Sequence, residues 1–134
     1  MNTTAPLAKY WILLVALLAL AAPHAALAHA RLVKSGPENK ADLAKAPEKV
    51  DLWFNELLDS GFNTIEVFVA GEIKSKQRTN LVQGEPVVNA KDKTHLSVTL
   101  KALPPGDYVI EYRVLSRDSH SAPGRILFRV VAPK

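Results

Sequence analysis

The chain has 134 residues and a formal net charge of +4, and it contains no cysteine. The absence of cysteine excludes thiolate nucleophiles and thiolate metal sites. A charge this small, with both signs scattered along the chain, gives no reason to expect binding to nucleic acid.

Residues 1–28 have the features of a secretory signal peptide. Lys9 supplies a positive start, and an unbroken apolar run of twelve residues follows at 11–22. Small residues at 26–28 then match a cleavage site. The apolar run is shorter than the ~20 residues that a bilayer span needs. We therefore expect an exported protein without stable membrane insertion, rather than one kept on an uncleaved anchor.

Two cleavage positions satisfy the same rule of small residues. A cut after Ala28 leaves 134 − 28 = 106 residues, which is enough for one domain, and makes His29 the first residue. A cut after Ala30 would remove that histidine. On the first cut, the exported domain is 29–134, and its net charge is 16 − 13 = +3.

The exported part alternates apolar and polar residues in short runs, which is the pattern of half-buried β-strands. In chain order, we expect strands at 31–35, 50–56, 64–70, 73–79, 87–88, 95–100, 108–115 and 125–130. Residues 38–47 look like a loop, and Gly71-Glu72 are expected to close a hairpin. About seven short strands with turns between them predict an all-β fold, a small Greek-key β-barrel or immunoglobulin-like sandwich of antiparallel strands.

A polar connection, residues 116–124, joins the last two strands. Pro123 and Gly124 predict irregular structure for it. The connection carries Asp118 and His120, whose side chains lie on one face of an extended chain. Such a pair is also common in solvated turns, so the spacing alone is a weak signal.

A histidine at a processed N-terminus can offer a metal two nitrogens, its free α-amine and ring Nδ1. The α-amine has a pKa of about 7.7–8.0, so a metal can displace its proton near neutral pH. If the first strand brings His29 beside Asp118 and His120, the site holds three nitrogens and one carboxylate oxygen. Cu(II) prefers such ligands in a tetragonal arrangement. The only methionine is Met1, so little remains to hold Cu(I).

Three classes of function remain open on these grounds. The first is a Cu(II)-binding protein, and the second is an immunoglobulin-like interaction module without metal. The third is a small copper oxidase or oxygenase, although 106 residues leave little room for a substrate surface. Serines near His120 resemble a hydrolase triad, but no sharp nucleophile turn accompanies them, so we do not expect an enzyme. His95 has no matching partner in the sequence and is expected to be a surface histidine.

Several segments of the exported part match a known pattern. They are His29-Ala30-Arg31-Leu32, Gly36-Pro37, 47–56, 103–108, 112–120, Gly124 and 128–130. With these segments, nearly all of 29–134 resembles the CopC family of periplasmic copper-binding proteins of bacterial copper resistance.

The resemblance implies a Greek-key β-barrel that binds one Cu(II) ion per chain. By analogy, His29 supplies amine and imidazole nitrogens, His120 a second imidazole and Asp118 a carboxylate. Glu56 matches a glutamate that can lie close to copper; its alternative role is an exposed carboxylate at a strand end. The resemblance also implies a periplasmic monomer that sequesters copper, confers tolerance, or delivers copper to an inner-membrane transporter of the CopD type.

Two departures from the family pattern affect these expectations. Some members carry a methionine-rich loop with a Cu(I) site, which this chain lacks. Proline often follows the histidine of the Asp-x-His motif, whereas Ser121 stands here. We therefore expect a Cu(II) site alone and a different path for the chain after His120.

Overall fold

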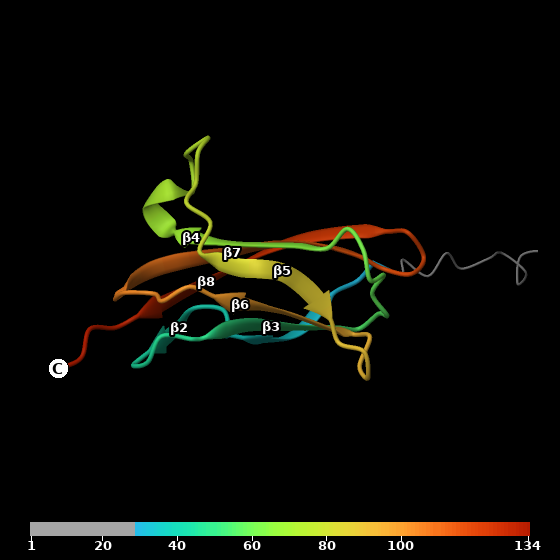
Figure 1. Ribbon diagram of the computed structural model, residues 1–134, viewed down its shortest axis with the longest axis horizontal. Coiled ribbons are helices and arrows are strands. Elements are labelled where there is room, and N and C mark those ends of the chain that lie inside the picture. Colours follow the sequence, from blue (N-terminus) through green and yellow to red (C-terminus); the bar gives the residue numbers. More distant parts are fainter. Residues whose placement is uncertain (1–28) are drawn as a thin grey trace, which may run out of the picture.

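The computed structural model describes residues 29–134, so the predicted signal peptide lies outside the described residues. Two four-stranded sheets pack face to face (Figure 1). The first sheet has the order β1 (Leu32–Gly36), β3 (Lys49–Phe54), β6 (His95–Leu100) and β5 (Val82–Val88). The second has the order β2 (Ala41–Leu43), β8 (Ser121–Val130), β7 (Gly106–Leu115) and β4 (Thr64–Val69).

This arrangement confirms the all-β prediction and is the sandwich rather than a closed barrel. Eight strands form instead of about seven, and β2 runs parallel to β8. Within the described residues, the one helical element is a 3-10 turn, η1 (Ala70–Glu72). None of the helical structure in 29–134 has the length and apolar character that a membrane crossing requires.

The core lies between the two sheets and follows the predicted alternation. On β3, Val50, Leu52 and Phe54 are buried, and they face Ile110 and Ile126 of the opposite sheet. Burying each such side chain contributes about 1.5–3 kcal/mol. A one-residue slip of β3 would turn these side chains into solvent, so the core fixes the register of this strand.

The expected hairpin into residues 73–79 is wrong. The chain makes η1 and then an irregular segment that folds back over the outer face of β4 and β7 (Figure 1). Phe68 and Val109 are paired on that face and fully buried. The Arg78 guanidinium lies 4.4 Å from the centre of the Phe68 ring. The segment therefore packs against Phe68 on this outer face.

Two other predictions, the loop at 38–47 and the brief strand at 87–88, are also corrected. Residues 38–47 contain the short strand β2, and the brief strand expected at 87–88 is the end of β5. β5 is longer than expected because a register shift between Gln83 and Val87 accommodates Gly84, whose φ is 82°. Glycine adopts such an angle without a Cβ penalty.

Pro123 and Gly124 lie within β8 and not in a loop. β2 pairs only with the far end of β8, so one edge of β8 has no neighbouring strand at Pro123. Proline, which has no N–H to donate, is tolerated there. The Tyr112 ring lies directly against Gly124 and occupies the space that a Cβ on Gly124 would fill. The connection between β7 and β8 is therefore short, residues 116–120, and tightly held.

Four connections gather at one end of the sandwich, on the right of Figure 1. They are residues 29–31, 55–63, 89–94 and 116–120. We call this region the loop end. It holds all the residues that the sequence predicted as metal ligands.

Candidate metal centre

The first described residues are fixed at the loop end by burial and by backbone hydrogen bonds. Ala30 is 6% exposed and belongs to the core. The Arg31 N–H donates to Asn55 Oδ1 at 2.6 Å, and the Asn55 N–H donates to the Arg31 carbonyl at 3.1 Å. His29 precedes this anchored pair by two residues, so its position is set by β1 and β3.

Residues 55–63, the connection after β3, anchor the loop between β7 and β8 as well as the start of the domain. The Arg117 N–H donates to the Leu57 carbonyl at 3.0 Å, and the Asp59 N–H donates to the Leu115 carbonyl at 2.8 Å. Leu58 forms an isolated bridge with Ser116. Residues 55–59 therefore hold two parts of the chain side by side that are about ninety residues apart in sequence.

The loop at 116–120 is tight because it satisfies its own polar groups. The Ser116 N–H donates to the His120 carbonyl at 3.0 Å, and the Ser119 N–H donates to the Ser116 carbonyl at 2.9 Å. Ser119 closes the turn with a φ of 70°. The buried Ser116 hydroxyl donates to Asp118 Oδ1, and the His120 N–H reaches the same oxygen at 3.3 Å.

These contacts set the charge of the Asp118 carboxyl. The hydrogen bond from Ser116 is the largest of the effects that lower its pKa, and bonds from His120 add to it. The carboxylate is therefore ionised at neutral pH. Each oxygen has two lone pairs, so Oδ2, with one hydrogen bond from His120, has room for a further partner.

At His120 the last connection of the domain meets its first residue, His29. Its Nδ1 lies 3.0 Å from Asp118 Oδ2, and its ring centre lies 5.2 Å from that of His29, at an angle of 50°. The side chain is 54% exposed. A ring nitrogen that donates to a carboxylate fixes the tautomer, so the other nitrogen, Nε2, carries the free lone pair that a metal needs.

Glu56 lies within the connection that joins the two halves of the site. It is half-buried, and within 29–134 no hydrogen bond or ion pair engages its carboxylate. It therefore occupies the loop end without a structural partner. No group of three or more His, Cys, Asp or Glu side chains among residues 29–134 already converges as a metal site. The side chains of His29, Asp118 and His120 therefore lie at the same end of the domain without forming a closed metal site.

Sequence reasoning missed two residues that build this arrangement. Asn55 ties the start of the domain to β3, and Ser116 orients Asp118. A serine two residues before an aspartate, at the end of a strand, is a signal for a closed polar turn. Asn55 had no comparable local signal, because its partner Arg31 lies 24 residues away.

The prediction that His95 is a surface histidine is wrong. Its side chain is 14% exposed, and Nε2 lies 2.7 Å from Asp51 Oδ1. The ring stacks on Trp53 with centres 4.4 Å apart, and Lys49 Nζ lies 3.1 Å from the other carboxylate oxygen. A cation on the aspartate and an aromatic ring on the histidine leave no room for a metal, so this pair is structural.

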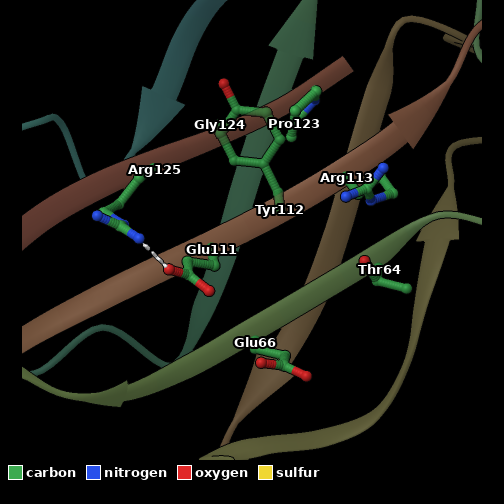
Figure 2. A pocket seen from close by; sticks show the side chains of 8 residues that line it. All are labelled: Thr64, Glu66, Glu111, Tyr112, Arg113, Pro123, Gly124 and Arg125. Carbon is green, nitrogen blue, oxygen red and sulfur yellow. Dashed lines mark hydrogen bonds and ion pairs between the residues drawn. The ribbon is translucent and has the colours of Figure 1, made fainter. Parts of the chain in front are cut away.

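A hollow of about 500 Å³ lies on the outer face of β4, β7 and β8, away from the predicted ligands (Figure 2). It is lined by Thr64, Glu66, Glu111, Tyr112, Arg113, Pro123, Gly124 and Arg125. Glu111 accepts hydrogen bonds from both Arg78 and Arg125, so its charge is already paired. None of His29, Asp118 and His120 lines it.

Comparison with known proteins gives a consistent result. The model of the CopC domain matches residues 32–131. The copper transport protein CutJ of Bacillus subtilis is 33% identical over 125 residues, which cover 91% of this chain. The chain spans only 21% of the length of CutJ.

Two solved structures have the same fold. CopC from Methylosinus trichosporium OB3b matches with a TM-score of 0.66 and 25% identity, over 79% of this chain and 97% of that one. PcoC, a methionine-rich copper resistance protein from Escherichia coli, matches with a TM-score of 0.63 and 30% identity, over 77% and 99%. These matches confirm the sandwich and the family resemblance.

Proposed function

Because this chain belongs to the CopC family, we propose that its exported form binds one Cu(II) ion at the loop end, in the periplasm. The family comprises copper-binding resistance proteins and not enzymes, which agrees with the expectation that this chain is not an enzyme. The predicted first step is cleavage after Ala28, which frees the α-amine of His29.

The main support is the approach of His29 to His120, whose ring centres lie 5.2 Å apart although the two residues are 120 − 29 = 91 positions apart in the sequence. An ion between the rings could take the α-amine and Nδ1 of His29 together with Nε2 of His120. All three donors are nitrogen, which suits Cu(II) better than harder divalent ions.

Asp118 is proposed as the fourth ligand and as the group that orients His120. In the structure Oδ2 accepts the hydrogen bond of Nδ1, which points away from Nε2, so to ligate an ion on Nε2 the carboxylate would exchange this hydrogen bond for the metal. Its negative charge would offset part of the ion's charge. Glu56 is proposed as an auxiliary carboxylate near the ion, because it is half-buried at the loop end and is not engaged by a cation there.

We further propose that the chain is a monomer that sequesters copper or delivers it to an inner-membrane copper transporter of the CopD type. The size of CutJ supports delivery, because a region similar to this chain forms about a fifth of a much longer copper transport protein. Sequestration alone would also give copper tolerance, and both roles need the same site.

Titration of the protein that begins at His29 tests the proposal. Isothermal calorimetry with Cu(II) should give one ion per chain, and electron paramagnetic resonance should report nitrogen ligands. Binding of the same affinity by a His120→Ala variant would contradict the site. A signal peptide cut after Ala30, detected by mass spectrometry of exported protein, would contradict the ligand set.

A further inference from the structure

Asn55 lies where the chain passes from the first sheet to the second. β3 ends one residue earlier, and the chain bends at residues 55–56. After the bend, the Leu57 carbonyl accepts the N–H of Arg117 at 3.0 Å, in the loop that carries His120. One short bend therefore joins the strand beside the start of the domain to the loop of the second histidine.

The side chain of Asn55 completes a backbone ladder that this bend interrupts. Leu32 and Phe54 are partners in the antiparallel ladder of β1 and β3, so Arg31 and Asn55 form the next pair. In such a ladder, every second pair exchanges two N–H···O bonds. The Asn55 N–H donates to the Arg31 carbonyl at 3.1 Å, but the return bond from the Arg31 N–H goes to Asn55 Oδ1, at 2.6 Å. The amide oxygen of the side chain therefore takes the place of the Asn55 backbone carbonyl.

The start of the domain depends on these two bonds because it is held from one side. β1 lies at the edge of its sheet, so among residues 29–134 it has a neighbouring strand, β3, on one side and none on the other. In the part of the chain that the structure describes, the hydrogen bonds nearest to His29 are the two between Arg31 and Asn55. Burial of Ala30 restrains the segment further. The bonds to Asn55 therefore fix the direction in which the chain reaches the proposed ligand.

We infer that Asn55 is a positioning residue of the copper site, which holds the α-amine and the ring of His29 where His120 can share the ion. The inference rests on the proposed function, because it assigns a residue to the same site. A ligand that is already in place binds more tightly than one that must be ordered on binding. Groups that orient metal ligands change metal affinity about 10–100-fold. Asn55 acts through the backbone of Arg31, so we expect the lower end of that range.

Two other roles for an asparagine at this place are a general contribution to stability and direct ligation of the metal. Asn55 is exposed, and so is its bond to Arg31, so water can replace that bond at little cost to the fold. Amide oxygens suit harder ions than Cu(II), and Oδ1 already accepts an N–H. The positioning role uses the oxygen in the contact that the structure shows.

The test compares three variants of the chain that begins at His29. Asn55→Ala removes the acceptor of the Arg31 N–H, and Asn55→Asp keeps an oxygen in its place. Asn89→Ala is the matched control, because Asn89 is also an exposed asparagine at the loop end. Its Oδ1 accepts the N–H of Lys91 at 2.8 Å and of Asp92 at 3.1 Å, within the connection at 89–94. Affinity for Cu(II) is measured by competition with a chelator, and stability by urea unfolding.

Asn55→Ala should lower the affinity for Cu(II) about tenfold. Asn55→Asp should restore it to within about threefold of the original chain, and Asn89→Ala should change it less than about twofold. Both alanine variants should unfold at urea concentrations close to that of the original chain, because each lost bond is exposed. Equal affinities of Asn55→Ala and the original chain would overturn the inference. An equal loss in Asn89→Ala would overturn it as well.

Two spectroscopic measurements separate a positioning residue from a ligand. In the protein without copper, NMR should show that the Arg31 amide proton exchanges with solvent about tenfold faster in Asn55→Ala than in the original chain. At saturating copper, the two proteins should give the same electron paramagnetic resonance spectrum, because their ligands are the same. A changed spectrum would overturn the inference in favour of Asn55 as a ligand.

A chain without the donors of residue 29 shows whether Asn55 acts through that residue. With His29→Ala and one additional alanine before it, residue 29 offers neither an amine nor an imidazole. In that chain, Asn55→Ala should change the residual affinity for Cu(II) less than about twofold. A tenfold loss there would overturn the inference. Absence of Cu(II) binding by the unaltered chain that begins at His29 would overturn the proposed function instead, so the two failures are distinguishable.

Discussion

His95 and His120 each lie within hydrogen-bonding distance of an aspartate, at 2.7 Å from Asp51 and 3.0 Å from Asp118. The first histidine is 14% exposed and the second 54%. The chemistry of the two pairs is the same, so their surroundings must explain any difference in function.

The side chains that surround the two pairs differ in charge and in whether they include a second imidazole. Beside His95, Lys49 neutralises the aspartate and Trp53 covers the imidazole. Beside His120, a second imidazole lies 5.2 Å away, and among residues 29–134 no Lys or Arg nitrogen lies within 4.0 Å of the Asp118 carboxylate. A histidine–aspartate pair is thus a structural element when aromatic and cationic groups enclose it. It becomes a candidate metal site when another nitrogen faces it.

Removal of either imidazole from the proposed site should have the largest effect on copper binding. His29→Ala loses a ring ligand, and His120→Ala loses the ligand that the Asp118 carboxylate orients. Loss of a group that only hydrogen-bonds a metal ligand already lowers metal affinity about 10–100-fold. Loss of either histidine should therefore lower it by more than about 100-fold. Competition titration against a Cu(II) chelator measures the change. Wild-type affinity in both variants would show that the two rings do not hold the ion.

Acidification should weaken copper binding strongly as well. Protons compete with the ion for the α-amine and the imidazole nitrogens, because these donors bind a metal only in their neutral form. The hydrogen bond from Ser116 lowers the pKa of the Asp118 carboxyl, so that group stays ionised between pH 7 and pH 5. Affinity should fall about tenfold or more per unit over this range, since each bound ion displaces at least one proton from the nitrogen ligands. An affinity that is constant down to pH 5 would indicate carboxylate ligands alone.

Ser116→Ala should have an intermediate effect on copper binding. Ser116 is 2% exposed, and its hydroxyl donates to Asp118, which holds the His120 ring. Without it, the carboxylate is free to rotate, and copper affinity should fall about tenfold. The pKa of Asp118 should rise toward its ordinary value, which titration by NMR measures. Ser121→Ala, an exposed neighbour, is the control and should change affinity less than twofold, about the range expected for a surface position.

His95→Ala should leave copper binding unchanged and lower stability. The variant loses the hydrogen bond to Asp51 and the stacking on Trp53, which together are worth about 1–3 kcal/mol. Urea unfolding monitored by tryptophan fluorescence measures the loss. His120→Ala should give the opposite pair of results, with the free energy of unfolding changed by no more than about 0.5 kcal/mol. A copper defect in His95→Ala would erase the distinction between the two pairs.

The contacts that the sequence predicts most clearly are those between residues close together in the chain. Asp118 and His120 stand two residues apart in a turn, so their contact needs no knowledge of the fold. The bond between His95 and Asp51 spans 44 residues and depends on the pairing of β3 with β6. Since strand register is set by the whole core, a single run of residues could not predict that bond.

The errors in the fold have the same cause. Alternation predicted a strand at 73–79, but in the structure that segment packs against Phe68 on the outer face of β4, a contact that alternation does not reveal. Pro123 indicated a loop, yet the short reach of β2 left a place in β8 where proline is tolerated. In both places the conformation depends on whether a segment distant in the sequence packs beside the chain, which the local pattern does not contain.

The most direct test of the copper site compares two chains that differ by one residue. One begins at His29, and the other carries a single additional alanine before it, which converts the α-amine into an amide and leaves every side chain in place. Titration with Cu(II) should give one tightly bound ion for the first chain and an affinity lower by about 100-fold or more for the second. Equal affinities would contradict the account, because the terminal amine would then not be a ligand.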